Sequence, residues 1–434
     1  MTLTDSRPDG ATDMSAFQSD SEFQMQPAPD EAARPWGRVA LILSASSVSF
    51  PTILTGVDLA RAATPTNFYL GLAGGGVVLT IIATLMGVIG SRTRLSSYML
   101  ANRAFGEHGA ACLNALFALS LVGWFGVNIE LFADAARALL AVLVGYHGAI
   151  WPLELGAGAL MTATTALGLR AIDRLSLWMT PLMTLIVMEL FARAFGVTTA
   201  GEAGRRILGH ALSAGEVITV VVGGVVVGAV TMPDFCRFLR RPAEVVAVSV
   251  CAYLLSASFV MLAGGFAGLA VPEGDALAAM RALGMGAAAF LLVFGGTWTI
   301  NALNLYSMAL SVSTLRPLRA NHAVLTIIGG VVGTAAAFAG LAEHFVEFLT
   351  YLSIAFMPVS GVIVADFYLA SPSLRPPGWA PFASWAVGML SGVLAMQQII
   401  TVTHVAACDA LLASVLTQAA LCRVGKKQTD PAGQ

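Results

Sequence analysis

The sequence predicts an all-α integral membrane protein with about 12 transmembrane helices. Of its 434 residues, 57% are hydrophobic and only 11% are charged, and the mean hydropathy of +0.79 exceeds what a soluble domain usually shows. The apolar runs also recur at the length that crosses a bilayer as a helix. The five cysteines follow no CxxC or CxxH spacing, so they indicate neither a disulfide framework nor a zinc site.

The two ends of the chain are polar. Residues 1–37 are mildly acidic and show no apolar period, so we expect a disordered cytoplasmic tail there. They do not resemble a signal peptide, because the first apolar run begins only at Val39. We expect a second cytoplasmic tail over residues 423–434 and the membrane domain over residues 38–422.

Twelve apolar segments of spanning length follow one another from Val39. They cover residues 39–60, 68–90, 110–144, 151–169, 175–195, 216–235, 244–271, 285–313, 323–341, 345–369, 379–399 and 404–422. With the N-terminus inside, 17 of the 23 Lys and Arg residues fall on the cytoplasmic side and five on the outer side. This bias predicts a multi-pass protein of the cell membrane with both termini in the cytoplasm.

Two of these spans carry helix-breaking residues within the membrane. The first reads SASSVSFPTILTG (Ser44–Gly56), and the sixth reads VVVGGVVVGAVTMP (Val220–Pro233), where Gly223, Gly224 and Gly228 are expected to loosen the helix. Irregular backbone at that depth is tolerated only where it is buried in protein or lines a cavity. Because spans one and six would begin two halves of five spans each, the pair predicts an inverted-repeat secondary transporter with its site at the midplane. Helix packing alone also explains glycine and proline in such spans.

The third span places an aromatic residue and an amide on one face. At 100° per residue, Leu121, Trp124 and Asn128 lie together, and Trp124 falls near the membrane centre. An aromatic ring with a nearby amide suits a flat heterocyclic ligand that stacks and hydrogen-bonds. Plain core packing explains the same residues equally well at this point.

A second face of the third span is charged. Glu130 and Asp134 are four residues apart and Arg137 follows three residues later, so Arg137 is expected to lie beside both acids. An unpaired charge in the membrane is costly. We therefore expect mutual neutralisation near the outer interface rather than proton coupling by Glu130.

Five stretches are similar to bacterial cytosine permeases of the nucleobase cation symporter family 1. They are IGSRTRLSSYMLANRAFG, VGWFGVNIELFA, TMPDFCRFLRRPAEV, WTINALNLYSMAL and YLSIAFMPVSGVIVADFYL. The resemblance covers roughly residues 39–420. It implies a leucine-transporter-like 5+5 inverted repeat with broken helices 1 and 6, over about 39–195 and 216–369, followed by two C-terminal helices over about 379–422.

The resemblance also implies the activity and the substrate site. We expect a cation- or proton-coupled symporter that imports a nucleobase-like heterocycle, cytosine or a related pyrimidine derivative, by alternating access. The substrate-binding residues implied are Trp124, Asn128, Leu121, Gly224 and Val225. Cytosine permeases carry a glutamine at Leu121, and a serine, an aromatic residue and a serine at Gly224, Val225 and Val227. Because these changes remove polar contacts, a bulkier or less polar relative of cytosine fits better.

A cation site is implied between spans one and eight. The matching ligands are the carbonyls of Ala45, Val48 and Gly296 and the side chain of Thr299, a shell of hard oxygens that suits sodium. Ile300 occupies the position of a second hydroxyl, so the coupling ion is sodium or a proton, and no other cofactor is expected. Asp58 is a candidate proton carrier, although pairing with Arg61 explains it more simply.

Two other classes stay open. A transporter of the same fold for another small solute, such as an amino acid, would bind a carboxylate at the broken helices. A membrane sensor that does not transport would need a folded output domain. The chain has no HExxH, GxSxG or GxxxxGK motif, so we do not expect an enzyme. The expected partners are the heterocyclic substrate and the lipid bilayer, without nucleic acid or an obligate protein partner.

Overall fold

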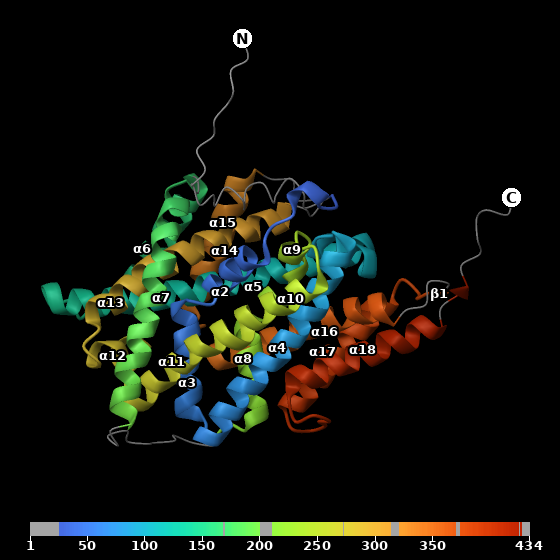
Figure 1. Cartoon of the computed structure of the whole chain (residues 1–434). Helices are drawn as coiled ribbons and strands as arrows, with labels where there is room; N and C mark the ends of the chain where they lie inside the picture. The colour runs from blue at the N-terminus through green and yellow to red at the C-terminus, as the bar shows by residue number, and fades with distance from the viewer. Residues whose placement is uncertain are drawn as a thin grey trace, which may run out of the picture.

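The computed structural model describes residues 26–167, 170–199, 211–271, 273–313, 321–369, 374–424 and 426–427. Within these ranges nearly every residue lies in a bundle of helices (Figure 1). Two short strands, β1 (Leu374–Arg375) and β2 (Lys426–Lys427), pair antiparallel near the C-terminus. The all-α fold expected from the sequence is therefore confirmed.

The helices follow the predicted spans in order. Span one is α2 (Trp36–Ser46) and α3 (Phe50–Ala62), preceded by the short η1 (Asp30–Ala32). The other helices are α4 (Pro65–Thr93), α5 (Ser97–Val144), α6 (Trp151–Leu167), α7 (Arg170–Thr199), α8 (Ala214–Val230), α9 (Met232–Cys236), α10 (Pro242–Ser249), η2 (Val250–Ala257), α11 (Ser258–Ala270), α12 (Ala276–Ala282), α13 (Gly286–Leu291), η3 (Leu292–Thr297), α14 (Trp298–Ser313), α15 (His322–Phe338), α16 (Phe345–Tyr368), α17 (Ala380–Met396) and α18 (Ala406–Val424).

Several of these helices, alone or joined end to end, have the length and composition of membrane spans. Seven such helical stretches are long and apolar enough to cross a bilayer within the described residues, or eight if the bent pair α2–α3 is counted as one span. The helices α8, α15 and α17 are apolar but shorter. The exact count of twelve spans stays a prediction.

The predicted break in span one is present. The axes of α2 and α3 differ by 61° across the interruption. The Ser44 carbonyl near the end of α2 accepts hydrogen bonds from the Ser47 amide (3.2 Å) and from the Ser256 hydroxyl of η2 (2.9 Å). Span seven thus satisfies a backbone group of the break, as an interruption inside a membrane requires.

The break in span six lies later than expected. We assigned it to Gly223, Gly224 and Gly228, but all three lie within the continuous helix α8, and the interruption falls at Thr231, before α9. A Cβ added at Gly223 would overlap the backbone carbonyl of Leu349 in α16. Gly223 therefore serves close packing between two helices rather than loosening one.

The first 25 residues of the predicted tail lie outside the described residues. Residues 26–37 differ from the predicted disorder, because they pack against two loops. The Ala28 amide donates to the Arg94 carbonyl (2.9 Å) and the Arg34 amide donates to the Phe238 carbonyl (3.0 Å). The Arg34 guanidinium also lies 4.8 Å from the centre of the Phe238 ring. At the other end, α18 extends to Val424, and residues 428–434 of the second predicted tail lie outside the described residues.

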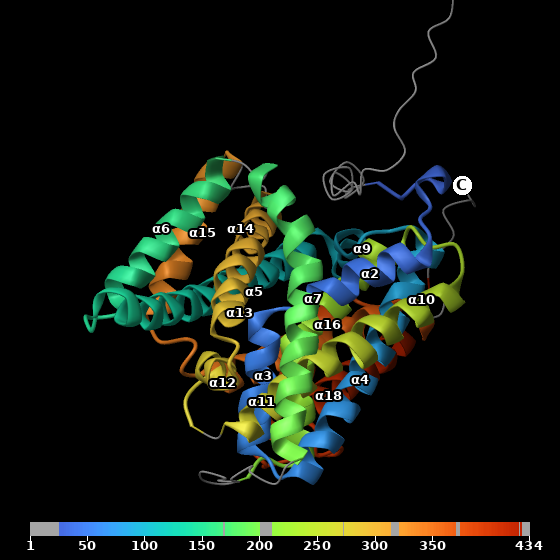
Figure 2. The same cartoon turned by 60° about the vertical axis from the view of Figure 1, so that its left-hand side comes forward.

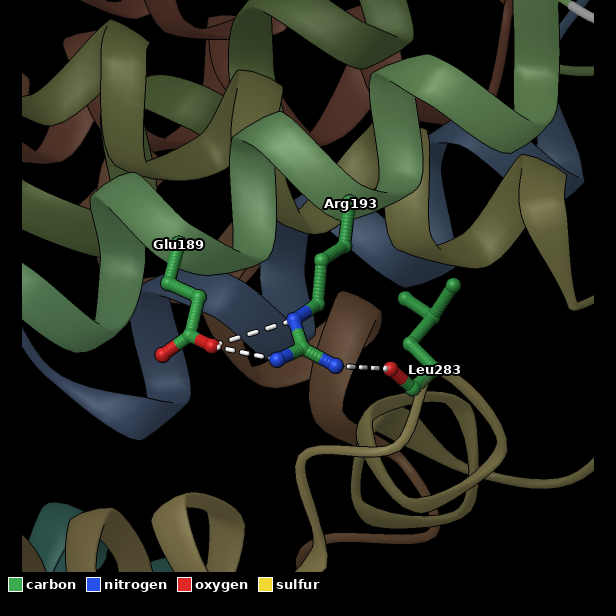
Figure 3. Close-up of polar contacts among 3 residues, drawn as sticks. All are labelled: Glu189, Arg193 and Leu283. Atoms are coloured by element: carbon green, nitrogen blue, oxygen red, sulfur yellow. Dashed lines mark hydrogen bonds and ion pairs between the residues drawn. The ribbon is translucent and has the colours of Figure 1, made fainter.

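Two arginines hold the connection around α12. Arg61 at the end of α3 donates to the carbonyl of Gly268 in α11 and to those of Val271 and Gly274, between α11 and α12. Arg193 of α7 donates to the Leu283 carbonyl just after it (3.1 Å) and pairs with Glu189 (2.7 Å), as Figure 3 shows. The end of the bundle that carries this connection is called the α12 end below (Figure 2).

Candidate functional site

Helix α5 places Trp124 against the start of α16. The indole is partly buried and meets the rings of Phe345 and Phe348 nearly at right angles, with centroids 6.0 and 5.4 Å away. Edge-to-face contacts of this kind are favourable for aromatic pairs. The preceding residue is Gly123, where a Cβ would lie only 2.9 Å from the Phe348 ring. The local sequence therefore lets α16 approach α5 closely at Trp124.

Asn128 lies one turn further along α5 and is completely buried. Its amide nitrogen donates to the Trp124 carbonyl (2.8 Å), and this bond sets the orientation of the carboxamide, since the reverse orientation would bring two oxygens together. The carboxamide oxygen has no hydrogen-bond partner among the described residues. Because buried polar atoms are almost always paired, this oxygen is the unusual feature of the site.

Helix α8 reaches the same part of α16. A Cβ added at Gly224 would make ordinary contacts with Met261 (3.4 Å) and Leu349 (3.9 Å). Leu349 directly follows Phe348, which contacts α5. The first turns of α16 thus lie between the predicted residues of α5 and those of α8, and Val225 packs partly buried against the same core as Trp124.

Leu121 lies apart from this group. It packs against a second cluster of buried residues that includes Val122, Phe125 and Leu305, whereas Trp124 packs against the main core. The structure therefore brings Trp124, Asn128 and Gly224 to one region around α16 and directs Leu121 toward α6, α14 and α15.

The predicted cation ligands lie at two irregular stretches of backbone. Ala45 is the second-last residue of α2, and its carbonyl accepts a hydrogen bond from the Val48 amide (3.1 Å) within the break. Gly296 lies in η3, a π-helix, and η3 contacts α3. π-Helical turns are frequent at functional sites.

The side chain of Thr299 suits a neutral cation shell. Its hydroxyl donates to the Gly295 carbonyl (2.8 Å), so the lone pairs of its oxygen stay available to a cation. No group of three or more His, Cys, Asp or Glu residues that could hold a metal occurs in the described ranges. The predicted ligand oxygens, three carbonyls and one hydroxyl, are all neutral.

The charged face of α5 differs from expectation. Arg137 pairs with Asp134 (3.0 Å), and both side chains are nearly half exposed. Glu130 does not join them; its carboxylate accepts a hydrogen bond from the Ala342 amide, with both oxygens 3.0 Å from that nitrogen. The expectation that Arg137 neutralises both acids is wrong for Glu130, because this acid is hydrogen-bonded to the loop before α16 and Arg137 pairs with Asp134 instead.

A cavity of about 410 Å³ opens at the α12 end of α5. Its lining combines charged residues of both signs with apolar residues. The charged and titratable residues in it are Asp134, Arg137, Tyr146, His147, Asp275 and Arg281. The cavity therefore lies near the charged end of α5, several turns beyond Trp124.

Sequence reasoning missed the contribution of α16. Phe345, Phe348 and Leu349 supply the contacts that join α5 to α8. The available signal was the stretch FVEFL at the start of span ten, with two aromatic residues three positions apart, which places both rings on one helix face. Only the three-dimensional arrangement shows that this face meets Trp124.

Comparison with known proteins gives a consistent result. A family of permeases for cytosine/purines, uracil, thiamine and allantoin matches residues 36–371. The cytosine permease of Escherichia coli strain K12 is 27% identical over 386 residues, covering 86% of this chain and 89% of that protein. The cytosine permease of Escherichia coli O157:H7 matches to the same extent.

The fold is similar to those of solved transporters. The inward-facing conformation of Mhp1 aligns with a TM-score of 0.76 at 18% identity, over 89% of this chain and 90% of Mhp1. Mhp1 in a closed conformation with bromovinylhydantoin bound, described as a nucleobase-cation-symport-1 family transporter, gives 0.68 at 18% identity, over 90% and 93%. A substrate-bound, outward-open Na⁺-coupled sialic acid symporter gives 0.66 at 12% identity, over 95% and 93%.

These matches confirm the transporter fold and the family expected from the sequence. The family match covers the helices from α2 to α16, including the broken span one and the residues around Trp124. The chain therefore belongs to the family of permeases for cytosine/purines, uracil, thiamine and allantoin.

Proposed function

We propose that this permease imports a flat heterocycle bearing an N–H group, stacked on Trp124 and hydrogen-bonded to Asn128. The observation that carries the proposal is the unpartnered, fully buried oxygen of Asn128 one turn from a partly buried indole. The Asn128 nitrogen is already engaged by the Trp124 carbonyl. The site therefore presents a hydrogen-bond acceptor, and the ligand has to supply the donor.

The substrate class follows from this chemistry. Nucleobases such as cytosine, and cyclic amides such as hydantoins, are flat and carry N–H donors. Gly224 leaves room beside Met261 and Leu349 for about one methyl group, and Val225 and Leu121 are the proposed apolar lining. We therefore favour a substituted or less polar relative of cytosine over cytosine itself.

The proposed mechanism is alternating access in the cell membrane with both chain ends in the cytoplasm. Residues 38–422 would form the transporter domain, with spans one, two, six and seven rocking against spans three, four, eight and nine around the Trp124 site. The Lys and Arg distribution supports this orientation.

Thermal unfolding of the purified protein with single ligands tests the substrate site. The panel holds purines, pyrimidines, hydantoins, thiamine precursors and amino acids. A heterocycle present at a hundred times its Kd should stabilise the protein by about 2.7 kcal/mol, and Trp124→Ala should remove that effect. Trp151→Ala, at an exposed position at the start of α6, is the matched control and should keep it. Stabilisation by amino acids alone, or an unchanged response in Trp124→Ala, would refute the stacked-heterocycle site.

Coupling to sodium is proposed at the carbonyls of Ala45, Val48 and Gly296 with the hydroxyl of Thr299. Thr299→Ala removes one of four oxygens and should raise the sodium concentration needed for half-maximal ligand stabilisation by about tenfold, since each lost interaction of roughly 1.4 kcal/mol is one decade. Ile300→Ser adds a hydroxyl at the neighbouring position and should lower that concentration. If substrate binding does not depend on sodium in the wild type, Thr299→Ala or Ile300→Ser but does depend on pH, the coupling ion is a proton.

A further inference from the structure

Glu130 is a buried acid that the substrate site does not use. It lies on α5 six residues after Trp124 and is only 6% exposed. An ionised carboxylate in such a place is costly unless hydrogen bonds satisfy it. In the described part of the chain its hydrogen-bond partners are backbone amides, chiefly that of Ala342 with that of Leu341 beside it, whereas the nearby Arg137 is engaged by Asp134.

The amide that binds Glu130 belongs to the turn just before α16. Ala342 precedes the N-cap residue of α16, His344, by two positions. In the same turn the Glu343 amide donates to the Gly340 carbonyl and the His344 amide to the Leu341 carbonyl. The Glu130 carboxylate accepts from the Ala342 amide and thus joins to α5 the segment that leads into α16.

The same two helices meet at the proposed substrate site. Phe345 and Phe348 contact Trp124 from α16, and Gly223 of α8 packs on the Leu349 backbone. The hydrogen bond between Glu130 and the segment just before Phe345 therefore determines how closely the α16 wall, formed by the Phe345 and Phe348 rings, approaches the indole. Without it, the start of α16 is joined to α5 at this point mainly through the rings.

We infer that Glu130 is a positioning residue of the transporter: its carboxylate anchors the start of α16 and holds Phe345 and Phe348 against the Trp124 side of the substrate site. Its effect on transport rests on the proposed function, whereas the anchor itself does not. Loss of the anchor releases the α16 wall, so a bound ligand dissociates faster while the translocating helices stay intact.

Hydrogen exchange tests the anchor without any ligand. In full-length Glu130→Ala, which removes both acceptor oxygens, amides within residues 339–349 should exchange about ten times faster than in the wild type, since a hydrogen bond to a charged group contributes at least that factor. Asp134→Ala is the matched control, because it removes an acid one turn away that pairs with Arg137 instead; it should leave this segment unchanged. Equal exchange in Glu130→Ala and the wild type would overturn the inference.

Uptake of radiolabelled cytosine tests the positioning role. Glu130→Ala should raise KM about tenfold with the maximal rate within about twofold of the wild type, and Glu130→Asp, which keeps the charge but shortens the reach, should lie between them. Faster exchange with an unchanged KM would reduce Glu130 to a structural anchor and refute the positioning role. If the wild type takes up no cytosine, the substrate proposal fails for cytosine, and the exchange result still decides whether the anchor exists.

Discussion

Gly223→Ala is expected to destabilise the protein by about 3 kcal/mol, whereas Gly224→Ala leaves its stability nearly unchanged. At Gly223 the added Cβ would overlap the carbonyl of Leu349. That obstacle is backbone, which cannot rotate away as a side chain can, so α8 and α16 have to separate. Overpacking a tight contact costs roughly 1–3 kcal/mol in general, and a backbone obstacle places this site at the upper end.

Gly224 is the matched control for this change. It is the next residue of the same helix, and its added Cβ would touch only side-chain atoms, Met261 at 3.4 Å and Leu349 at 3.9 Å. Both changes raise helix propensity by a similar amount, so the difference between them isolates the contact with α16. Thermal unfolding of both variants in detergent measures it. Similar melting temperatures for the two would show that α8 and α16 do not approach each other as described.

Asp409→Ala is the second change for which we expect a large loss of stability, about 3 kcal/mol. Asp409 lies in the first turn of α18 and is 3% exposed. Its carboxylate accepts four hydrogen bonds of 2.7 to 3.0 Å from residues 401–403. Removing it leaves four donors without their acceptor, and each buried unsatisfied donor costs about 1–3 kcal/mol, partly relieved by water.

The loop that Asp409 organises also packs on α8. A Cβ at Gly215 would overlap the His404 carbonyl, and the Ala407 amide lies 3.4 Å from the Thr219 hydroxyl of α8. The two C-terminal helices therefore reach the start of span six through residues ordered by Asp409 (Figure 1). The loss in Asp409→Ala should appear in α8 as well as in α18.

Asp409→Asn separates the hydrogen bonds from the charge. It keeps one acceptor oxygen, so it should lose about half as much stability as Asp409→Ala. Glu189→Gln is the control, because Glu189 forms a pair with Arg193 in which both side chains are nearly half exposed, and such pairs contribute about 1 kcal/mol or less. Thermal unfolding combined with hydrogen exchange over α8 measures these effects. A loss confined to α18 would contradict the link to span six.

The composition of the chain and its local sequence patterns were enough to predict the all-α membrane architecture. The apolar runs depend only on the bilayer as a solvent, so the order of the spanning segments follows directly from the sequence. The short α12, between predicted spans seven and eight, was not expected. The break at Ser47–Ser49 was also predictable, since serines and Pro51 act on the local backbone. The spacing of Trp124 and Asn128 predicted their shared face for the same reason: one helix determines it.

Contacts between distant segments were decided by tertiary structure. From the sequence alone, Gly223 is interpreted as a helix breaker. In the structure it lies within a continuous helix and allows α16 to approach α8 closely. Arg137 sits near Glu130 along α5, yet the Ala342 amide, 212 residues away in sequence, receives that carboxylate. Phe345 and Phe348 gain their place beside Trp124 in the same way. The local pattern determines which face of a helix a residue occupies. Its partner on another helix depends on how whole helices pack, because that packing is the arrangement in which all the contacting side chains fit together.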